Sequence, residues 1–189
     1  ITTIYEGTSE IMEMTIGRDR WQEHLKSRGA FYHDLGTDLE KLALAQPNVG
    51  ATAAALAHHA FAEMMEIARV QRLTRNQHVL FRLGELAAPV ECAGALARRA
   101  AAAERGELPD KADTRCEAEQ LAAVSRGFAR EAAAKAAYDG LRWVMGASAP
   151  GAVDAAALEN AMALREIEQA QSGLIADMDA VADALYGRG

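Results

Sequence analysis

The chain has 189 residues and a formal net charge of −7 at pH 7. That length suits one domain, or one domain with an appendage, and is sufficient to bury a core. The negative charge disfavours nucleic acid and anionic membranes as partners, because both are negative themselves and attract basic patches. Cys92 and Cys116 form no CxxC pair and no Cys/His cluster, which disfavours a disulfide scaffold or a zinc site and predicts free, buried thiols.

No apolar run reaches the length of about 18 residues that a membrane-spanning helix needs, and the first residues lack the order of a signal peptide. We therefore expect no transmembrane segment and a cytoplasmic location. The chain begins with Ile rather than Met, which predicts a piece of a longer polypeptide.

The opening stretch, ITTIYEGTSEIM, places a polar turn with one carboxylate directly before a predicted helix. Gly7 permits a sharp turn, and Thr8 or Ser9 can cap the helix by accepting a hydrogen bond from an early backbone N–H. Glu10 lies in the first turn, where the helix dipole favours a negative charge. Glu6 is thereby presented at a helix N-terminus.

This stretch resembles the signature near the C-terminal end of acyl-CoA dehydrogenases, in which a Tyr-Glu-Gly-Thr turn leads into a helix that carries an arginine. Arg18 holds that arginine position here. The resemblance implies that Glu6 is the base that removes the α-proton of an acyl-CoA thioester while the β-hydride goes to FAD. It also implies that Thr8 and Glu10 lie beside the flavin nucleotide, and that Gly7 and Arg18 belong to the substrate pocket.

The resemblance covers about the first 20 residues, whereas ordinary members of the family end shortly after the arginine helix. The greater length is similar to that of the very-long-chain members, which carry an extra helical domain and form homodimers. We therefore expect residues 1–46 to end the catalytic domain and residues 47–189 to form an appended bundle. The implied partners are acyl-CoA and an electron-transfer flavoprotein, and the chain alone is expected to bind no FAD and to be inactive.

An alternative interpretation of the same turn is a plain helix cap, in which case the chain is a non-catalytic helical bundle that mediates assembly. A simple cap does not require Tyr5, Glu6 and Gly7 before it or Arg18 after it. The flavin content of the complete polypeptide distinguishes the two hypotheses.

The first helix is predicted to run from about residue 11 to residue 26 and to stop at Ser27-Arg28-Gly29. After a short connector, Thr37 and Glu40 have the spacing of a capping box, which predicts a second short helix that ends before Pro47.

Apolar residues at steps of three and four predict a longer helix over about 49–73. His59, Glu63 and Glu66 fall on another face of it. The Glu-x-x-His pairs of a di-iron centre are missing, as is His-Glu-x-x-His, so this face is predicted to be solvated and not to bind metal. We assign His58 and His59 no function.

Three further helices are predicted over about 76–103, 113–145 and 152–186, and Pro89 is expected to interrupt the first of them. The last has the clearest apolar stripe, in which Gln171 is the one polar member. The stripe consists of Leu164, Ile167, Gln171, Leu174, Met178, Val181 and Leu185.

No strand-like alternation persists after the opening stretch, so the predicted fold is all-α. Long helices joined by short turns predict an antiparallel bundle of about four long helices, preceded by one or two shorter helices. Because the first helix exposes four apolar side chains if nothing packs on it, we expect an oligomer. These side chains are Ile11, Met14, Ile16 and Trp21.

Overall fold

The structure, a computed structural model, describes residues 8–112 and 116–188. Within those ranges it contains helices and no strand, which confirms the all-α prediction. The helices are α1 (Ser9–Lys26), α2 (Ala30–Ala45), α3 (Ala51–Val70), the 3-10 helix η1 (Leu73–Arg75), α4 (Gln77–Glu104), α5 (Ala118–Ala147), α6 (Ala155–Ala161), α7 (Leu164–Ala170) and α8 (Leu174–Tyr186).

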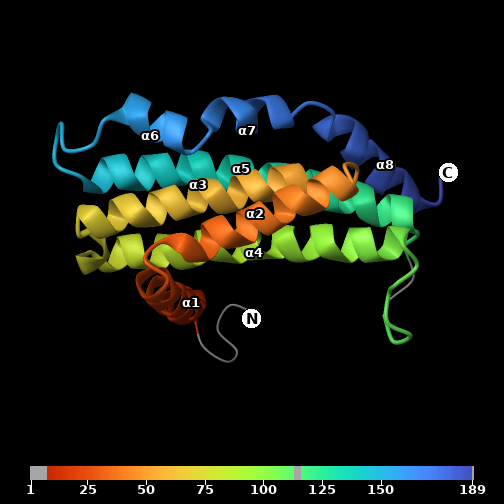
Figure 1. Ribbon diagram of the computed structural model, residues 1–189, viewed down its shortest axis with the longest axis horizontal. Coiled ribbons are helices and arrows are strands. Elements are labelled where there is room, and N and C mark those ends of the chain that lie inside the picture. Colours follow the sequence, from red (N-terminus) through yellow and green to blue (C-terminus); the bar gives the residue numbers. More distant parts are fainter. Residues whose placement is uncertain (1–7, 113–115, 189) are drawn as a thin grey trace.

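Helices α2 to α5 form the body of an antiparallel bundle and run in alternating directions along its long axis (Figure 1). The pairs α2–α3, α3–α5 and α4–α5 make the most extensive contacts. Helix α1 crosses α4 near one end of the bundle, and α6, α7 and α8 follow one another along the outside of α5 (Figure 1). No helix within the described ranges is long and apolar enough to cross a membrane.

The buried core has two parts with different packing. One part is built from bulky side chains, among them the fully buried Tyr32, Phe61 and Met65. The other part consists largely of alanines from α3, α4 and α5, such as Ala93 and Ala97. Because alanine has a single methyl group and a high helix propensity, these helices approach closely without a break in their backbone.

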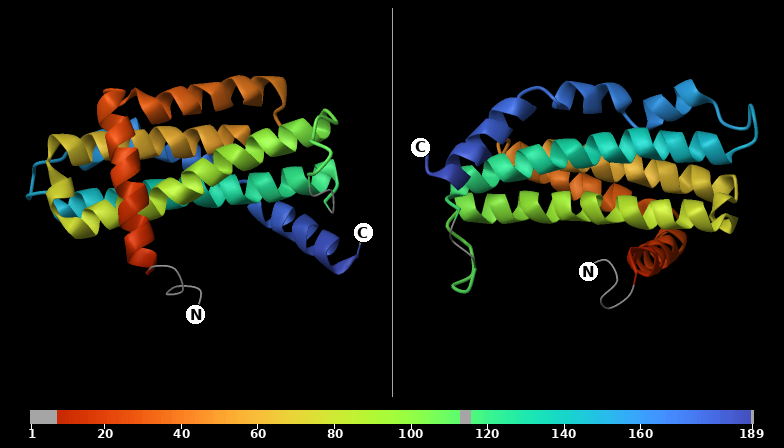
Figure 2. Two further views of the ribbon diagram at one scale, coloured as in Figure 1. Left: turned by 90° about the horizontal axis from the view of Figure 1, so that it is seen from below. Right: turned by 180° about the vertical axis from the view of Figure 1, so that it is seen from behind.

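Glycines allow an even closer contact where α1 crosses α4. A Cβ added at Gly17 would lie 2.5 Å from the Leu80 carbonyl oxygen, and one added at Gly84 would lie 1.9 Å from the Glu13 carbonyl oxygen. The backbones of the two helices therefore touch at this crossing, which Figure 2 shows from below. Ile16 and Trp21 pack against the core beside it, so the expectation that these two side chains lack partners is wrong.

Several predicted boundaries differ from the structure. Thr37 and Glu40 lie inside α2 and do not cap a helix, because α2 already begins at Ala30, after a reversal at Gly29 with φ 89°. Helix α4 continues through Pro89 rather than being interrupted there. The cysteines are free as predicted, but both are exposed rather than buried.

The predicted last helix is three helices in the structure. Ala163, with φ 52°, separates α6 from α7, and Gly173, with φ 85°, separates α7 from α8. A left-handed backbone at each position ends one helix and redirects the next. Only Ile167 of the predicted stripe is fully buried, whereas Met178 and Leu185 are 49% and 77% exposed. Gln171 donates its side-chain amide to the carbonyls of Arg130 and Ile167, so it is a satisfied amide.

Candidate functional site

Three of the residues implied by the resemblance, Thr8, Glu10 and Arg18, lie at the start and on the outer side of α1. Glu6 and Gly7 are outside the described residues. Thr8 precedes α1 in an extended conformation, and its carbonyl oxygen accepts hydrogen bonds from the backbone N–H groups of Ile11 and Met12. Its hydroxyl does not cap the backbone, contrary to one of the two predicted caps. Hydrogen bonds from the backbone and from the Thr8 hydroxyl lower the pKa of Glu10, which is exposed in the first turn.

The two faces of α1 have different roles. Glu13, Gly17 and His24 follow one another at helical spacing on the side that faces the bundle. Arg18 lies on the opposite side, is exposed, and makes no ion pair with the part of the chain that the structure describes. The outward face is continued along the helix by Ile11, Thr15, Gln22 and Leu25, all exposed.

Charged side chains fix α1 on the bundle in this orientation. Arg20 donates from Nε and Nη2 to the two carboxylate oxygens of Glu91 on α4, at 2.5 and 2.9 Å. The fully buried Tyr32 on α2 donates its hydroxyl to the same carboxylate at 2.7 Å. Arg82 on α4 binds Glu13 at 3.0 Å. A two-pronged arginine–carboxylate pair is geometrically restrictive, so the side of α1 that faces outward is well defined.

A row of histidine and glutamate side chains runs along α3, where sequence analysis predicted a solvated face. Glu66 faces His24 of α1, with Nε2 and Oε2 3.2 Å apart. Glu63 faces His33 of α2, with Nε2 and Oε1 3.3 Å apart. The prediction of a solvated face is therefore only partly confirmed, because α1 and α2 cover part of it while the side chains of Glu63 and Glu66 remain 30% and 39% exposed.

At the centre of this row, the Nδ1 atoms of His33 and His59 lie 2.9 Å apart. Nε2 of His59 faces Glu40 of α2 at 3.4 Å. Gly36 makes room for the ring, because a Cβ there would lie 2.6 Å from Nε2 of His59. Two carboxylates thus flank a histidine pair, and every member comes from α2 or α3.

Two histidines of this row, His24 and His59, have similar electrostatic surroundings. Burial lowers the pKa of His24, against the opposing effect of Glu66, and burial likewise lowers the pKa of His59, against Glu40. No three or more His, Cys, Asp or Glu residues among those described are arranged to hold a metal ion. The row links α1 and α2 to α3 through polar side-chain contacts.

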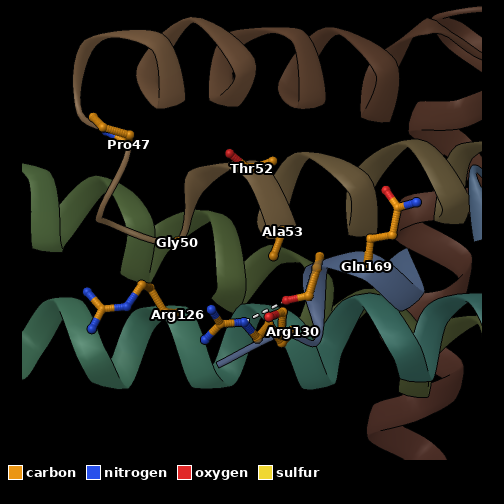
Figure 3. Close-up of a pocket in the computed structure, with 9 residues that line it drawn as sticks. Pro47, Gly50, Thr52, Ala53, Arg126, Arg130 and Gln169 are labelled. Atoms are coloured by element: carbon orange, nitrogen blue, oxygen red, sulfur yellow. Dashed lines mark hydrogen bonds between the residues drawn. The ribbon is translucent and has the colours of Figure 1, made fainter. Parts of the chain in front are cut away.

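A pocket of 260 Å³ lies between the start of α3, the middle of α5 and the link from α7 to α8 (Figure 3). Arg126 and Arg130 line it from α5. Both bind Asp177 of α8, Arg126 through Nε at 2.9 Å. Arg126 also donates to the Asn48 carbonyl at 2.8 Å, and Arg130 donates to the Ala170 carbonyl at 2.7 Å.

Asp177 is 7% exposed. Burial opposes its ionisation, but hydrogen bonds from Arg126 and Arg130 outweigh that effect and lower the pKa of the carboxyl group. Most guanidinium donors at this pocket are therefore used by the protein itself. The arrangement anchors α8 and its link to α7 on the bundle, and it leaves little capacity to hold an anionic ligand.

Sequence reasoning missed both the histidine and glutamate row along α3 and the two arginines that bind Asp177, for the same reason. His33, Gly36 and Glu40 recur at steps of three and four, as do Arg126 and Arg130. That spacing indicates a shared helix face but does not say which helix packs against it.

Comparison of the chain with protein-family models, with curated proteins and with solved structures returned no match. The class that the fold defines is an all-α antiparallel helical bundle with a crossing helix at one end.

Proposed function

We propose that the chain is the C-terminal part of a flavin-dependent acyl-CoA dehydrogenase that desaturates fatty acyl-CoA thioesters between the α- and β-carbons. The observation that carries the proposal is the turn Tyr5-Glu6-Gly7-Thr8 followed at once by a helix with Arg18. In support of it, α1 begins at Ser9, directly after Thr8. Arg18 and Thr8 are both exposed, and Arg18 lies on the side of α1 that faces away from the bundle.

In the proposal, α1 is the boundary between this bundle and a catalytic body. The bundle covers the Gly17 side of the helix, and the outward side is available to the catalytic body that carries most of the flavin and acyl-CoA pocket. In the proposal, Arg18 and Gly7 contribute to the thioester side of that pocket. The uncovered charge of Arg18 fits a role toward a negative or polarised group on the ligand.

Glu6 takes the α-proton of the thioester in this proposal. FAD, when bound, accepts the hydride from the β-carbon, and an electron-transfer flavoprotein then receives the electrons. Thr8 and Glu10 lie beside the nucleotide. Because its lowered pKa keeps Glu10 ionised, its carboxylate suits a hydroxyl donor such as that of a ribose and would repel a phosphate.

The test uses the complete polypeptide that contains this chain. It should purify with flavin, and its Glu6→Gln variant should still bind flavin and acyl-CoA, because glutamine keeps the size and polarity of the side chain. Loss of a general base slows such a step by about 100- to 10,000-fold. The measurement is the rate at which the flavin absorption bleaches when acyl-CoA is added without oxygen.

Glu159→Gln is the matched control, because it removes an exposed carboxylate of α6 that has no role in the proposal, and this variant should bleach at a rate close to that of the unchanged protein. A complete polypeptide without flavin would remove the enzyme hypothesis altogether. Bleaching of Glu6→Gln at the unchanged rate would assign the base to another residue.

A further inference from the structure

Positive charge gathers in two segments of this acidic chain. Residues 67–84 and 140–153 contain five arginines and no aspartate, glutamate or lysine. The rest of the chain has 15 basic and 27 acidic residues, which is a net charge of −12. The formal charge of −7 is therefore the sum of a small positive region and a more strongly negative remainder. Such an asymmetry indicates a place where an anionic partner can bind.

The two segments lie together at one end of the bundle. They contain the end of α3, all of η1, the start of α4 and the end of α5, which Figure 1 shows at the same end. Gln71 donates its side-chain amide to the carbonyl oxygen of Ala152 at 3.2 Å. The rings of His78 and Trp143 meet edge to face, with their centroids 4.8 Å apart. The segments therefore contact each other at two points.

Two of the five arginines are neutralised within the protein, because Arg69 pairs with Glu66 and Arg82 pairs with Glu13. The other three are exposed, and none of them makes an ion pair or donates a side-chain hydrogen bond to a described residue. Basic side chains near a helix C-terminus often bind its last carbonyls, but these three do not. We call them the arginine cluster: Arg72, Arg75 and Arg142.

Arg142 is held in place by an aromatic side chain. Its Cζ lies 4.7 Å from the centroid of the Trp143 ring, and Trp143 packs against the core. Stacking uses the face of a guanidinium group and leaves the N–H groups at its edge available to a carboxylate. Val70 and Met145, which belong to the same two segments, are 55% and 37% exposed. This end of the bundle thus offers cations and apolar side chains together.

Charge and extent select the kind of anion. A nucleic acid or an anionic membrane presents negative charge over a wide area, so it would also meet the acidic remainder of the chain. Screening limits an exposed charge to a range of about 8 Å at physiological salt, so a short segment that stays at this end interacts mainly with the arginine cluster. The carboxylates of such a segment can each accept two hydrogen bonds from one guanidinium group.

We propose that the arginine cluster is a docking site for a short acidic segment of a partner protein. Glutamates or aspartates of the segment bind the three arginines, and apolar residues between them contact Val70 and Met145. Because the arginines are exposed, each ion pair is weak and the interaction depends on salt. The inference does not depend on the proposed dehydrogenase activity.

The test is binding of a short labelled peptide that contains glutamate, leucine and serine, measured by fluorescence anisotropy with the full chain. The control peptide has glutamine in place of every glutamate. We expect the affinity of the glutamate peptide to fall as the salt concentration rises from about 50 mM to about 300 mM. The glutamine peptide should bind at least about tenfold more weakly at the lower salt concentration, because it lacks the complementary charge.

Two double variants of equal charge locate the site. Arg72→Gln combined with Arg75→Gln removes two members of the arginine cluster and should weaken binding of the glutamate peptide by at least about threefold, as the loss of two exposed ion pairs implies. Arg165→Gln combined with Arg188→Gln removes two exposed arginines outside the two segments and should bind as the unchanged chain does. Urea midpoints of both double variants verify that they fold.

Equal binding of the glutamate and glutamine peptides, or equal binding of the glutamate peptide by the two double variants, would overturn the proposal. A dimer in light scattering that Arg72→Gln with Arg75→Gln converts to a monomer would also overturn it, because the occupant would then be a second copy. Single-stranded DNA or phosphatidylserine vesicles that bind more tightly than the glutamate peptide, and that lose binding in the same double variant, would assign the site to a different class of partner and overturn it as well.

Discussion

Gly84→Ala tests the closest helix contact in the molecule, the crossing of α1 over α4. The added Cβ would lie 1.9 Å from the carbonyl oxygen of Glu13 and 2.8 Å from its carbonyl carbon. Ordinary contact begins near 3.4 Å, so the new atom is about 1.5 Å too close to the oxygen. Both neighbours are backbone atoms that cannot rotate away. Helix α1 must therefore move outward as a body.

The cost follows from what α1 loses when it moves. The ion pair of Arg82 with Glu13 lengthens, and Ile16 and Trp21 lose part of their contact with the core. Overpacking typically costs about 1–3 kcal/mol, and alanine returns about 1 kcal/mol through its higher helix propensity. Because backbone atoms oppose the methyl group, the upper part of the overpacking range applies. We expect a net loss of about 2 kcal/mol in the free energy of unfolding.

Urea unfolding, followed by circular dichroism and tryptophan fluorescence, measures this loss. With a typical slope of about 2 kcal/mol per molar, the midpoint should fall by about 1 M. Gly127→Ala is the matched control, because the same substitution in α5 meets no atom within 4 Å and should stabilise the chain by up to about 1 kcal/mol. If Gly84→Ala unfolds at the same urea concentration as the unchanged chain or at a higher one, the helices do not touch as described.

Two further predictions concern the core and the response to acid. Ile167→Ala should destabilise the chain by about 2–4 kcal/mol, because this side chain is fully buried. Leu185→Ala should change the free energy of unfolding by less than about 0.5 kcal/mol, because this side chain is 77% exposed. Equal urea midpoints of the two variants would contradict the assigned burial. Burial lowers the pKa of His24, His58 and His59 below the ordinary value of 6.5, so the unfolded chain binds protons before the folded chain does. Their contribution to stability is complete above about pH 6.5 and is lost as the pH falls through that value toward the lower folded pKa values. Urea midpoints measured at about pH 7.5 and about pH 5.5 should show this loss of stability, and His58→Gln should make the loss smaller. A urea midpoint that rises on acidification would refute the prediction.

Local signals in the sequence predicted the helices whose ends are set by local chemistry. Asn76 caps α4, because its side chain accepts a hydrogen bond from the backbone N–H of His78 at the predicted start of this helix. The predicted end of the first helix at residues 27–29 also agrees with the structure, because Gly29 adopts the left-handed conformation that such an end requires. The division of the last predicted helix could not be foreseen at Ala163. An alanine is a strong helix former, so its residue type does not predict the left-handed φ of 52° that it adopts.

The histidine and carboxylate row could not be predicted for a different reason. Helix α3 is buried on most sides, because twelve of its twenty residues are buried. Such a helix has no single solvent-facing stripe, so the apolar period does not tell which polar residues another helix will cover. The partners His24 and His33 lie 42 and 26 residues away from their contacts in the chain, and only the tertiary fold brings them together.

The contact of His33 with His59 also limits how many hydrogens these rings can carry. A gap of 2.9 Å between two ring nitrogens holds one N–H, because two bare lone pairs repel there and two N–H groups collide. The tautomer of one ring therefore dictates the tautomer of the other. If both rings become imidazolium, each carries a hydrogen on Nδ1, and the rings have to separate. Double protonation of the pair would thus break this link between α2 and α3.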